Sequence, residues 1–286
     1  MIIVTGANGK LGRAIVENLL ELVPTEQIGI SVRDPAKAKD FADRGVRVRY
    51  GDFTAATSLD DALEGATQVL IVSVDTLGEQ GVAQSKTAID AAYRAGAHRV
   101  LYTSHQAAAP DSSFPPARDH AAVEAYLEAC GRPFTSLRHG YYTTSLQFHI
   151  RDAARTGEIV APADGPVSWT APADLAKADA AILASEGRFD GPTPPLTAAE
   201  AINLQDVAAV LSEVLGHTVR RVVVDDEDWI ASQVKRGMPE SVARLFIGTY
   251  HASRSGVFAV TDPTLGMLIG QKPQSVRAFF QATMTK

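Results

Sequence analysis

The first half of the chain alternates short apolar runs with amphipathic stretches. Residues 2–5 and 28–32 are runs of strand length, and residues 69–74 form a continuous apolar run, which is typical of a strand buried on both faces. Between the first two runs, Ile15, Leu19 and Leu22 recur at helical spacing. The pattern predicts strands at residues 2–5, 28–32, 46–50, 69–74, 99–103 and 134–138, and helices at residues 11–22, 35–44, 58–63, 80–95 and 118–129, with Ser58 as an N-cap.

Strands that alternate with helices predict parallel pairing, right-handed crossovers and helices on both faces of one sheet. The expected fold class is α/β, a doubly wound parallel Rossmann sheet with ligands at the carboxyl ends of its strands. Beyond about residue 140 the regular alternation of strands and helices ends. Helices are expected there at residues 173–184, 203–215, 229–235, 239–251 and 274–284, and a strand at 219–224. We therefore expect a Rossmann domain at residues 1–150 and a smaller mixed α/β substrate domain at residues 151–286, which can interleave with the first.

A glycine-rich turn follows the first predicted strand. Gly6, Gly9 and Gly12 lie between residues 2–5 and the first helix, in the sequence Thr-Gly-Ala-Asn-Gly-Lys-Leu-Gly. In such a turn the first glycine makes the bend, the second lets the backbone approach a pyrophosphate, and the third lets the helix pack close to the strand. Because the helix N-terminus presents free N–H groups, the segment is expected to hold the phosphates of a dinucleotide.

Composition narrows the range of partners. The 286 residues include 27 Lys and Arg and 33 Asp and Glu, a net charge of −6, which argues against nucleic acid as the main partner. Cys130 is the only cysteine, which excludes an intrachain disulfide and a cysteine metal cluster, and no metal is expected. No apolar run reaches the roughly 18 residues of a membrane helix, and no leader pattern precedes the first strand, so a cytoplasmic protein is expected.

The end of the second strand points to the type of dinucleotide. A carboxylate there binds the ribose 2′-hydroxyl of NAD, whereas an arginine suits the 2′-phosphate of NADP. The strand ends with Val32 and Arg33, so NADP(H) is expected and NAD(H) is the less favoured alternative. Asp34 precedes Pro35 and is expected to cap the next helix instead.

Two further segments are expected near the adenosine. Asp52 follows the third strand and is placed to accept a hydrogen bond from the adenine amino group, with Phe53 beside the ring, although a simple Asp turn is the alternative. Ser73 and Val74 end the fourth strand and should run beside the ribose and pyrophosphate. The full set expected to bind cofactor is Gly6, Asn8, Gly9, Lys10, Leu11, Gly12, Arg33, Asp52, Phe53, Ser73, Val74, Thr103 and Tyr141.

The usual proton relay of short-chain dehydrogenases is missing. Those enzymes carry Tyr-x-x-x-Lys, in which the tyrosine protonates the carbonyl oxygen and the lysine assists it. None of the seven tyrosines here has a lysine four residues later. An electron-poor quinone can take its proton from water, so this absence is compatible with a reductase.

Several segments together resemble the NmrA-like, atypical short-chain dehydrogenase/reductase family. They are the opening glycine turn, Val-Arg-Asp-Pro-Ala-Lys-Ala at 32–38, Gly-Asp-Phe at 51–53, Tyr-Thr-Ser at 102–104 and Arg-His-Gly-Tyr-Tyr at 138–142. The chain looks most similar to the branch of NADPH quinone oxidoreductases and triphenylmethane-dye reductases, and residues 204–216 look like a recurrent helix of the family. The resemblance implies an extended Rossmann core, a cleft between two domains, NADP(H), and the absence of the Tyr/Lys pair.

The family also implies an alternative, because it includes a redox-sensing regulator without known enzyme activity. Two departures stand out. His139 replaces the asparagine usual after the arginine, and His105 follows Tyr-Thr-Ser. Both are expected to face the nicotinamide pocket and to alter the substrate.

Catalytic candidates lie at the strand ends. Ser104 follows the fifth strand and His105 is next to it, while His120 occupies the helix region of the missing Tyr/Lys pair, one turn before Glu124. Because histidine titrates near neutral pH, His105 or His120 is expected to serve as proton donor. The alternatives are a helix-surface pair for His120 and Glu124, and interface packing for the two tyrosines that follow the sixth strand. The residues expected to act in catalysis are Ser104, His105, His120 and Tyr142.

These observations favour an NADPH-dependent oxidoreductase that transfers hydride to a quinone or to an aromatic or polyketide-like ketone. The alternative is a catalytically idle NADP(H) sensor that binds a partner protein. A sugar epimerase or dehydratase ranks last, because it depends on Tyr-x-x-x-Lys. A small aromatic or quinone-like partner is expected, without nucleic acid or membrane, and a homodimer is left open.

Overall fold

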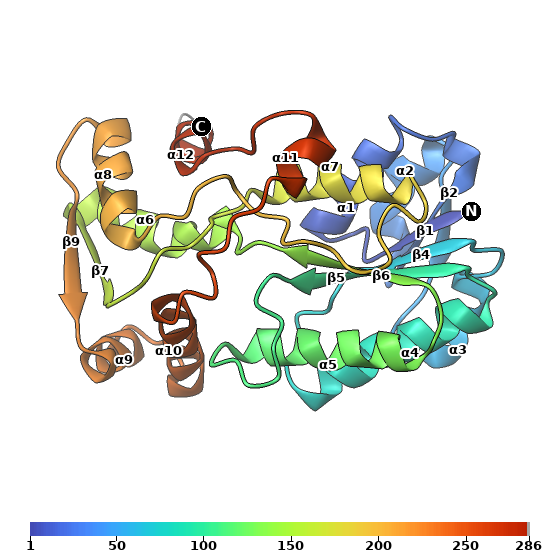
Figure 1. Ribbon diagram of the computed structural model, residues 1–286, viewed down its shortest axis with the longest axis horizontal. Coiled ribbons are helices and arrows are strands. Elements are labelled where there is room, and N and C mark those ends of the chain that lie inside the picture. The colour runs from blue at the N-terminus through green and yellow to red at the C-terminus, as the bar shows by residue number, and fades with distance from the viewer. Residues whose placement is uncertain (285–286) are drawn as a thin grey trace.

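A seven-stranded parallel sheet forms the centre of the molecule in the computed structural model, which describes residues 1–284 (Figure 1). The strand order is β3-β2-β1-β4-β5-β6-β8, which reverses direction between β1 and β4, where open α/β sheets bind their ligands. The strands are β1 (Ile2–Thr5), β2 (Ile28–Val32), β3 (Arg47–Tyr50), β4 (Gln68–Ile71), β5 (Arg99–His105), β6 (Phe134–His139) and β8 (Gly191–Pro192).

Helices cover both faces of this sheet, as the sequence predicts for a doubly wound fold (Figure 1). One layer holds α3 (Ala56–Ala62), α4 (Glu79–Arg94) and α5 (Pro115–Ala129). The other holds α1 (Lys10–Leu19), α2 (Lys39–Asp43), α7 (Pro172–Leu183) and α11 (Thr264–Ile269). Each layer buries its own apolar cluster against the sheet, with Ile15, Leu101 and Leu175 on the α1/α7 face and Ile89, Val100 and Leu127 on the α4/α5 face.

The C-terminal part packs around a second, two-stranded parallel sheet of β7 (Glu158–Pro162) and β9 (Arg220–Val224). It contains α6 (Gln147–Thr156), α8 (Leu204–Leu215), α9 (Asp226–Lys235), α10 (Glu240–Arg254) and α12 (Val276–Met284), and its core includes Trp229, Phe258 and Phe280. Short 3-10 helices η1 (Thr25–Gln27), η2 (Pro35–Ala38) and η3 (Thr143–Leu146) complete the elements. Within residues 1–284, no helix is long and apolar enough to cross a membrane.

The structure corrects several local predictions. Ser58 lies inside α3 rather than at its N-cap, which is Ala55, and its hydroxyl accepts from the Asp52 N–H at 2.9 Å. The strand expected at residues 69–74 ends at Ile71, and β5 continues through His105. The sequence pattern missed α6, β7, β8 and α11. Since α7 packs on α1 and β8 pairs with β6, part of the chain beyond residue 150 returns to the Rossmann layer.

Candidate cofactor and acceptor site

The glycine turn after β1 has the geometry that a phosphate cradle needs. Gly6 has a φ of 66°, a conformation that favours glycine, and its N–H donates to the Ser31 carbonyl at 3.0 Å. A Cβ on Gly12 would lie 2.6 Å from the Gly6 carbonyl oxygen, so only glycine lets α1 approach this closely. No side chain caps the start of α1 at Gly9. The turn therefore leaves the helix N-terminus open, which fits an anionic phosphate.

The two loops that follow β1 and β2 are joined at this edge. The Asn8 side-chain amide donates to the Asp34 carbonyl at 2.8 Å, and Asp34 caps η2 by accepting from the Ala36 N–H at 3.2 Å. The capping role expected of Asp34 is thus confirmed. Arg33 is exposed beside them and has no ion pair among the described residues. Its guanidinium is therefore free to bind an added phosphate.

Asp52 is held in a local turn, the alternative left open above. One carboxylate oxygen accepts from the Thr54 N–H and from the Thr54 hydroxyl, each at 2.8 Å, and these bonds lower the pKa of Asp52. The second oxygen remains available for a ligand, so the adenine contact stays a prediction. Phe53 is half-buried against the core of the α4/α5 face.

Thr103 supports the loop after β4 from inside the sheet. It is buried, its hydroxyl accepts from the Ser73 N–H at 2.8 Å, and the same hydroxyl donates to the Ser73 hydroxyl at 3.1 Å. The arrangement positions Ser73 and Val74, which are half-buried, beside the glycine turn, where a Gly6 Cβ would lie 3.5 Å from Val72. Thr103 therefore acts through Ser73 rather than presenting its own hydroxyl at the sheet edge.

Ser104, Glu124 and Arg138 form a buried polar group between β5, α5 and β6. The Ser104 hydroxyl donates to Glu124 Oε1 at 2.7 Å, and Arg138 donates to both carboxylate oxygens, at 3.1 and 2.6 Å. The carboxylate raises the pKa of Arg138. Since its proton is engaged by Glu124, the Ser104 hydroxyl is not free to protonate a substrate. Glu124 is also not part of a helix-surface pair with His120, because the two side chains have different partners.

We expect Glu124→Gln to lower the free energy of unfolding by about 2 kcal/mol, because it leaves the Arg138 charge without its carboxylate. The loss stays below that of a fully buried pair, since the Arg138 side chain is 31% exposed. Urea unfolding monitored by circular dichroism measures it. Asp60→Asn, which breaks the exposed Arg94–Asp60 pair, is the matched control and should cost less than about 0.5 kcal/mol. Equal losses in the two variants would contradict the role given to Glu124.

His105 ends β5 inside an aromatic cluster. Its ring centroid lies 5.4 Å from Phe114, 5.6 Å from Phe258 and 6.0 Å from Tyr141. Nδ1 accepts from the Ala107 N–H at 3.1 Å, which places the ring proton of the neutral tautomer on Nε2. That buried Nε2 has no hydrogen-bond partner among the described residues. An unpaired buried donor is costly, which makes this N–H a candidate for a bond to an acceptor oxygen.

His120 lies beside His105, with ring centroids 6.2 Å apart. Its Nδ1 is 2.9 Å from the Tyr102 hydroxyl. Burial lowers the pKa of His105 to about 3 and that of His120 to about 4. Both rings are therefore neutral near pH 7. The expectation that either histidine donates a proton by titrating near neutrality is corrected, although His105 can still donate a hydrogen bond.

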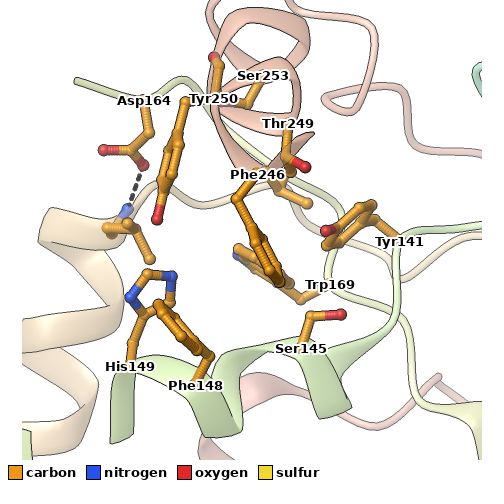
Figure 2. Close-up of a pocket in the computed structure, with 12 residues that line it drawn as sticks. Tyr141, Ser145, Phe148, His149, Asp164, Trp169, Phe246, Thr249, Tyr250 and Ser253 are labelled. Carbon is orange, nitrogen blue, oxygen red and sulfur yellow. Dashed lines mark hydrogen bonds between the residues drawn. The ribbon is translucent and has the colours of Figure 1, made fainter. Parts of the chain in front are cut away.

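Tyr141 belongs to the aromatic cluster and also lines a cavity in the C-terminal part, in which Figure 2 shows it. Side chains from α6 and α10 converge on this cavity, among them Phe148, His149, Phe246 and Tyr250, and Trp169 also lines it (Figure 2). Its volume is about 50 Å³. That is well below the roughly 150 Å³ of an engineered cavity that admits benzene. The cavity alone is therefore too small for an aromatic ring.

His139 lies at the end of β6 and packs toward α7. It is buried, with Nε2 3.0 Å from Asp179 Oδ1 on α7 and Nδ1 3.1 Å from the Tyr142 hydroxyl. Because His105 and His139 are register partners on the neighbouring strands β5 and β6, the expectation that both face the nicotinamide pocket stays a prediction. Tyr142 is half-buried against the α1/α7 core at the carboxyl edge of β6.

Sequence reasoning missed Phe114, Trp169, Phe258 and Asp179. They come from segments far apart in the chain, and no spacing pattern links them to the strand ends. Within residues 1–284, no three His, Cys, Asp or Glu side chains gather as a set of metal ligands.

Comparison with known proteins gives consistent matches. Residues 1–265 match the NmrA-like family. Quinone oxidoreductase 2 of Escherichia coli (strain K12) is 32% identical over 274 residues, which cover 94% of each chain. The NAD(P)H azoreductase of Xenophilus azovorans is 28% identical over 284 residues, 99% of this chain and 97% of the relative.

Solved structures agree with these relatives. The NADPH complex of the Escherichia coli NADPH-dependent quinone oxidoreductase superposes with a TM-score of 0.93 at 30% identity, over 100% of both chains. The NADP(H) complex of Citrobacter sp. triphenylmethane reductase gives a TM-score of 0.90 at 32% identity, over 99% of this chain and 100% of the other.

Proposed function

The chain belongs to the NmrA-like family, and from that membership we propose that it is an NADPH-dependent oxidoreductase whose acceptor is a quinone or an aromatic ketone. The observation that carries the choice of acceptor is the free Nε2–H of His105 inside an aromatic cluster. This donor lies at the carboxyl edge of the sheet that also carries the glycine turn. Planar rings stack on such aromatic side chains, and a carbonyl oxygen accepts from the imidazole N–H.

The residues present fit NADPH. The open N-terminus of α1 and the close packing at Gly12 suit the pyrophosphate, and Arg33 suits the 2′-phosphate. Bound NADPH would supply a hydride, which is the chemistry that the protein itself lacks. The relatives that are quinone and triphenylmethane reductases with NADPH-bound structures support this cofactor.

The chain's own residues then bind and orient the acceptor. The half-buried Phe114 and Tyr141 supply flat apolar surfaces, the fully buried Phe258 supports them, and His105 donates to the oxygen on which negative charge develops. The ring of His105 is fixed by the Ala107 N–H, so its donor needs no reorganisation during the reaction. A quinone reduced in this way can take its proton from water.

The direct test is NADPH oxidation by the purified chain with menadione and a panel of other quinones and aryl ketones. We expect turnover with at least the quinones. Tight NADPH binding, measured by fluorescence titration, without turnover on any acceptor would overturn the proposal and favour the sensor alternative.

Arg33→Ala is expected to reduce the preference for NADPH over NADH, expressed as the ratio of kcat/KM values, by about 10- to 100-fold. One lost charge-assisted hydrogen bond to phosphate costs about 1.5–3 kcal/mol. Steady-state kinetics with both cofactors measure the ratio. Arg94→Ala, which removes an exposed arginine paired with Asp60 between α3 and α4, is the control and should leave the ratio unchanged. An unchanged ratio in Arg33→Ala would contradict its assignment to the 2′-phosphate.

A further inference from the structure

Three titratable side chains form a continuous hydrogen-bonded chain behind β6. Asp179 Oδ1 on α7 is 3.0 Å from His139 Nε2, and His139 Nδ1 is 3.1 Å from the Tyr142 hydroxyl. Asp179 and His139 are 0% and 1% exposed, whereas Tyr142 is half-buried at the carboxyl edge of the sheet. This series of hydrogen bonds thus leads from the protein interior to the edge of the sheet where ligands of this fold bind.

Burying these polar groups costs more free energy than a purely structural contact needs. Asp179 lies on α7, which packs against α1, and its neighbours Leu175, Ala176 and Leu183 on the same helix are fully buried. Asp179 Oδ2 has no hydrogen-bond partner among the described residues. A well-packed apolar pair in place of a buried carboxylate and imidazole is often equally stable or more stable. The position of these groups therefore suggests a chemical role.

His139 also differs from the two other histidines near this edge. Among the described residues, His105 and His120 have no carboxylate partner, but His139 contacts one directly. A carboxylate at hydrogen-bond distance stabilises an imidazolium. Of the three histidines, His139 is the one that bridges a carboxylate and a phenol, the arrangement that a proton relay needs.

We propose that Asp179, His139 and Tyr142 form a proton relay that protonates the oxygen of a reduced ketone. Tyr142 is the catalytic residue, and His139 and Asp179 are positioning residues that act through it. The inference rests on the reductase function proposed above. It extends that function to ketones, whose alkoxide is far more basic than the oxygen of a reduced quinone and needs an acid.

The step balances in protons and electrons. The two electrons of the hydride from NADPH end in the new C–H bond of the acceptor, and the carbonyl oxygen becomes an alkoxide. The Tyr142 O–H bond breaks as its proton forms the new O–H bond of the alcohol. A proton from solvent, passed on by His139, then restores the Tyr142 phenol after the alcohol leaves, while Asp179 holds the imidazole in place.

The charged and titratable groups that face His139 are Asp179 from α7, Tyr142, His105 from β5 and His120 from α5. Burial, and secondarily the Asp179 charge, raise the pKa of Tyr142. The phenol therefore keeps its proton near neutral pH, and the far more basic alkoxide of a reduced ketone can take it.

The test compares kcat for trifluoroacetophenone with kcat for menadione, using the full chain and NADPH. Tyr142→Phe is expected to lower the ketone value about 100-fold more than the quinone value, within the range of general acid catalysis. His139→Asn keeps a side-chain N–H for Asp179 but cannot pass a proton to Tyr142, so its ketone rate should fall while its quinone rate is kept. Asp179→Asn removes the carboxylate that orients the His139 ring and should lower the ketone rate by a smaller factor.

The ratio of the two rates cancels losses from folding or from NADPH binding, which thermal unfolding and fluorescence titration measure separately. Tyr126→Phe is the matched control, because its hydroxyl donates to Asp90 on α4, away from the relay. Its ratio should equal that of the wild type. Equal ratios in Tyr142→Phe and wild type, a wild-type ratio in His139→Asn, or a wild type that reduces menadione but no ketone would overturn the relay. Failure with both acceptors would overturn the reductase function itself.

Discussion

Lowering the pH from 7 to 5 is expected to reduce the free energy of unfolding by roughly 4 kcal/mol, because three histidines are held neutral in the folded chain. Burial lowers the pKa of His105 to about 3, and that of His120 and His149 to about 4. In the unfolded chain each ring titrates near its ordinary value of about 6.5. Below that pH the unfolded state binds protons that the folded state does not, so stability falls as the pH falls.

The size of the effect follows from the distance between pH 5 and the unfolded value. For each histidine that stays neutral in the folded state, the free energy of unfolding falls by about 2 kcal/mol over these 1.5 pH units, at about 1.4 kcal/mol per unit. His105 has the most buried ring, whereas His120 and His149 are half-buried and therefore contribute less. The expected total loss in free energy of unfolding is thus smaller than three full contributions. The carboxylates with lowered pKa values, such as Asp40 and Asp226, contribute only at lower pH.

Urea unfolding at pH 7, 6 and 5 measures the prediction. His105→Phe should flatten the dependence by about 2 kcal/mol, since it removes one of the three groups. His217→Asn alters an exposed histidine after α8 and is the control that should keep the wild-type slope. A free energy of unfolding that stays constant between pH 7 and 5 would contradict the neutral state assigned to the three rings.

The sequence predicted the strands and crossovers of the Rossmann layer well, because each is encoded locally. Apolar runs between helices, and glycines where the backbone turns, determine β1, β2 and β4 and the cradle at Gly6. The end of β5 was harder to predict, since Ser104 and His105 are polar strand residues whose places are set by Glu124 and by the aromatic cluster.

The acceptor site depends on contacts that no local pattern contains. Phe114 and Phe258 are 144 positions apart in the printed sequence, yet their ring centroids are 5.4 Å apart. Strand alternation alone predicts that Arg138 and His139 point to opposite faces of the sheet. The structure agrees, since Arg138 bonds Glu124 on α5 and His139 bonds Asp179 on α7. The identity of each partner, however, depends on tertiary packing.

His105→Phe is expected to lower kcat for menadione about 100-fold and to leave the Kd for NADPH unchanged. Phenylalanine keeps a ring among Phe114, Tyr141 and Phe258 but removes the Nε2 donor, and loss of one such donor typically costs 100-fold or more in rate. Stopped-flow and steady-state kinetics measure the effect.

His105→Gln separates the hydrogen bond from packing, because glutamine ends in an amide N–H at a similar reach. It should recover part of the activity lost in His105→Phe. Since burial holds the pKa of His105 at about 3, the ring contributes a hydrogen bond rather than a proton, and kcat for menadione should not follow a His105 titration between pH 5 and 9. A His105→Phe enzyme as fast as the wild type would contradict the role of His105 as donor to the acceptor oxygen.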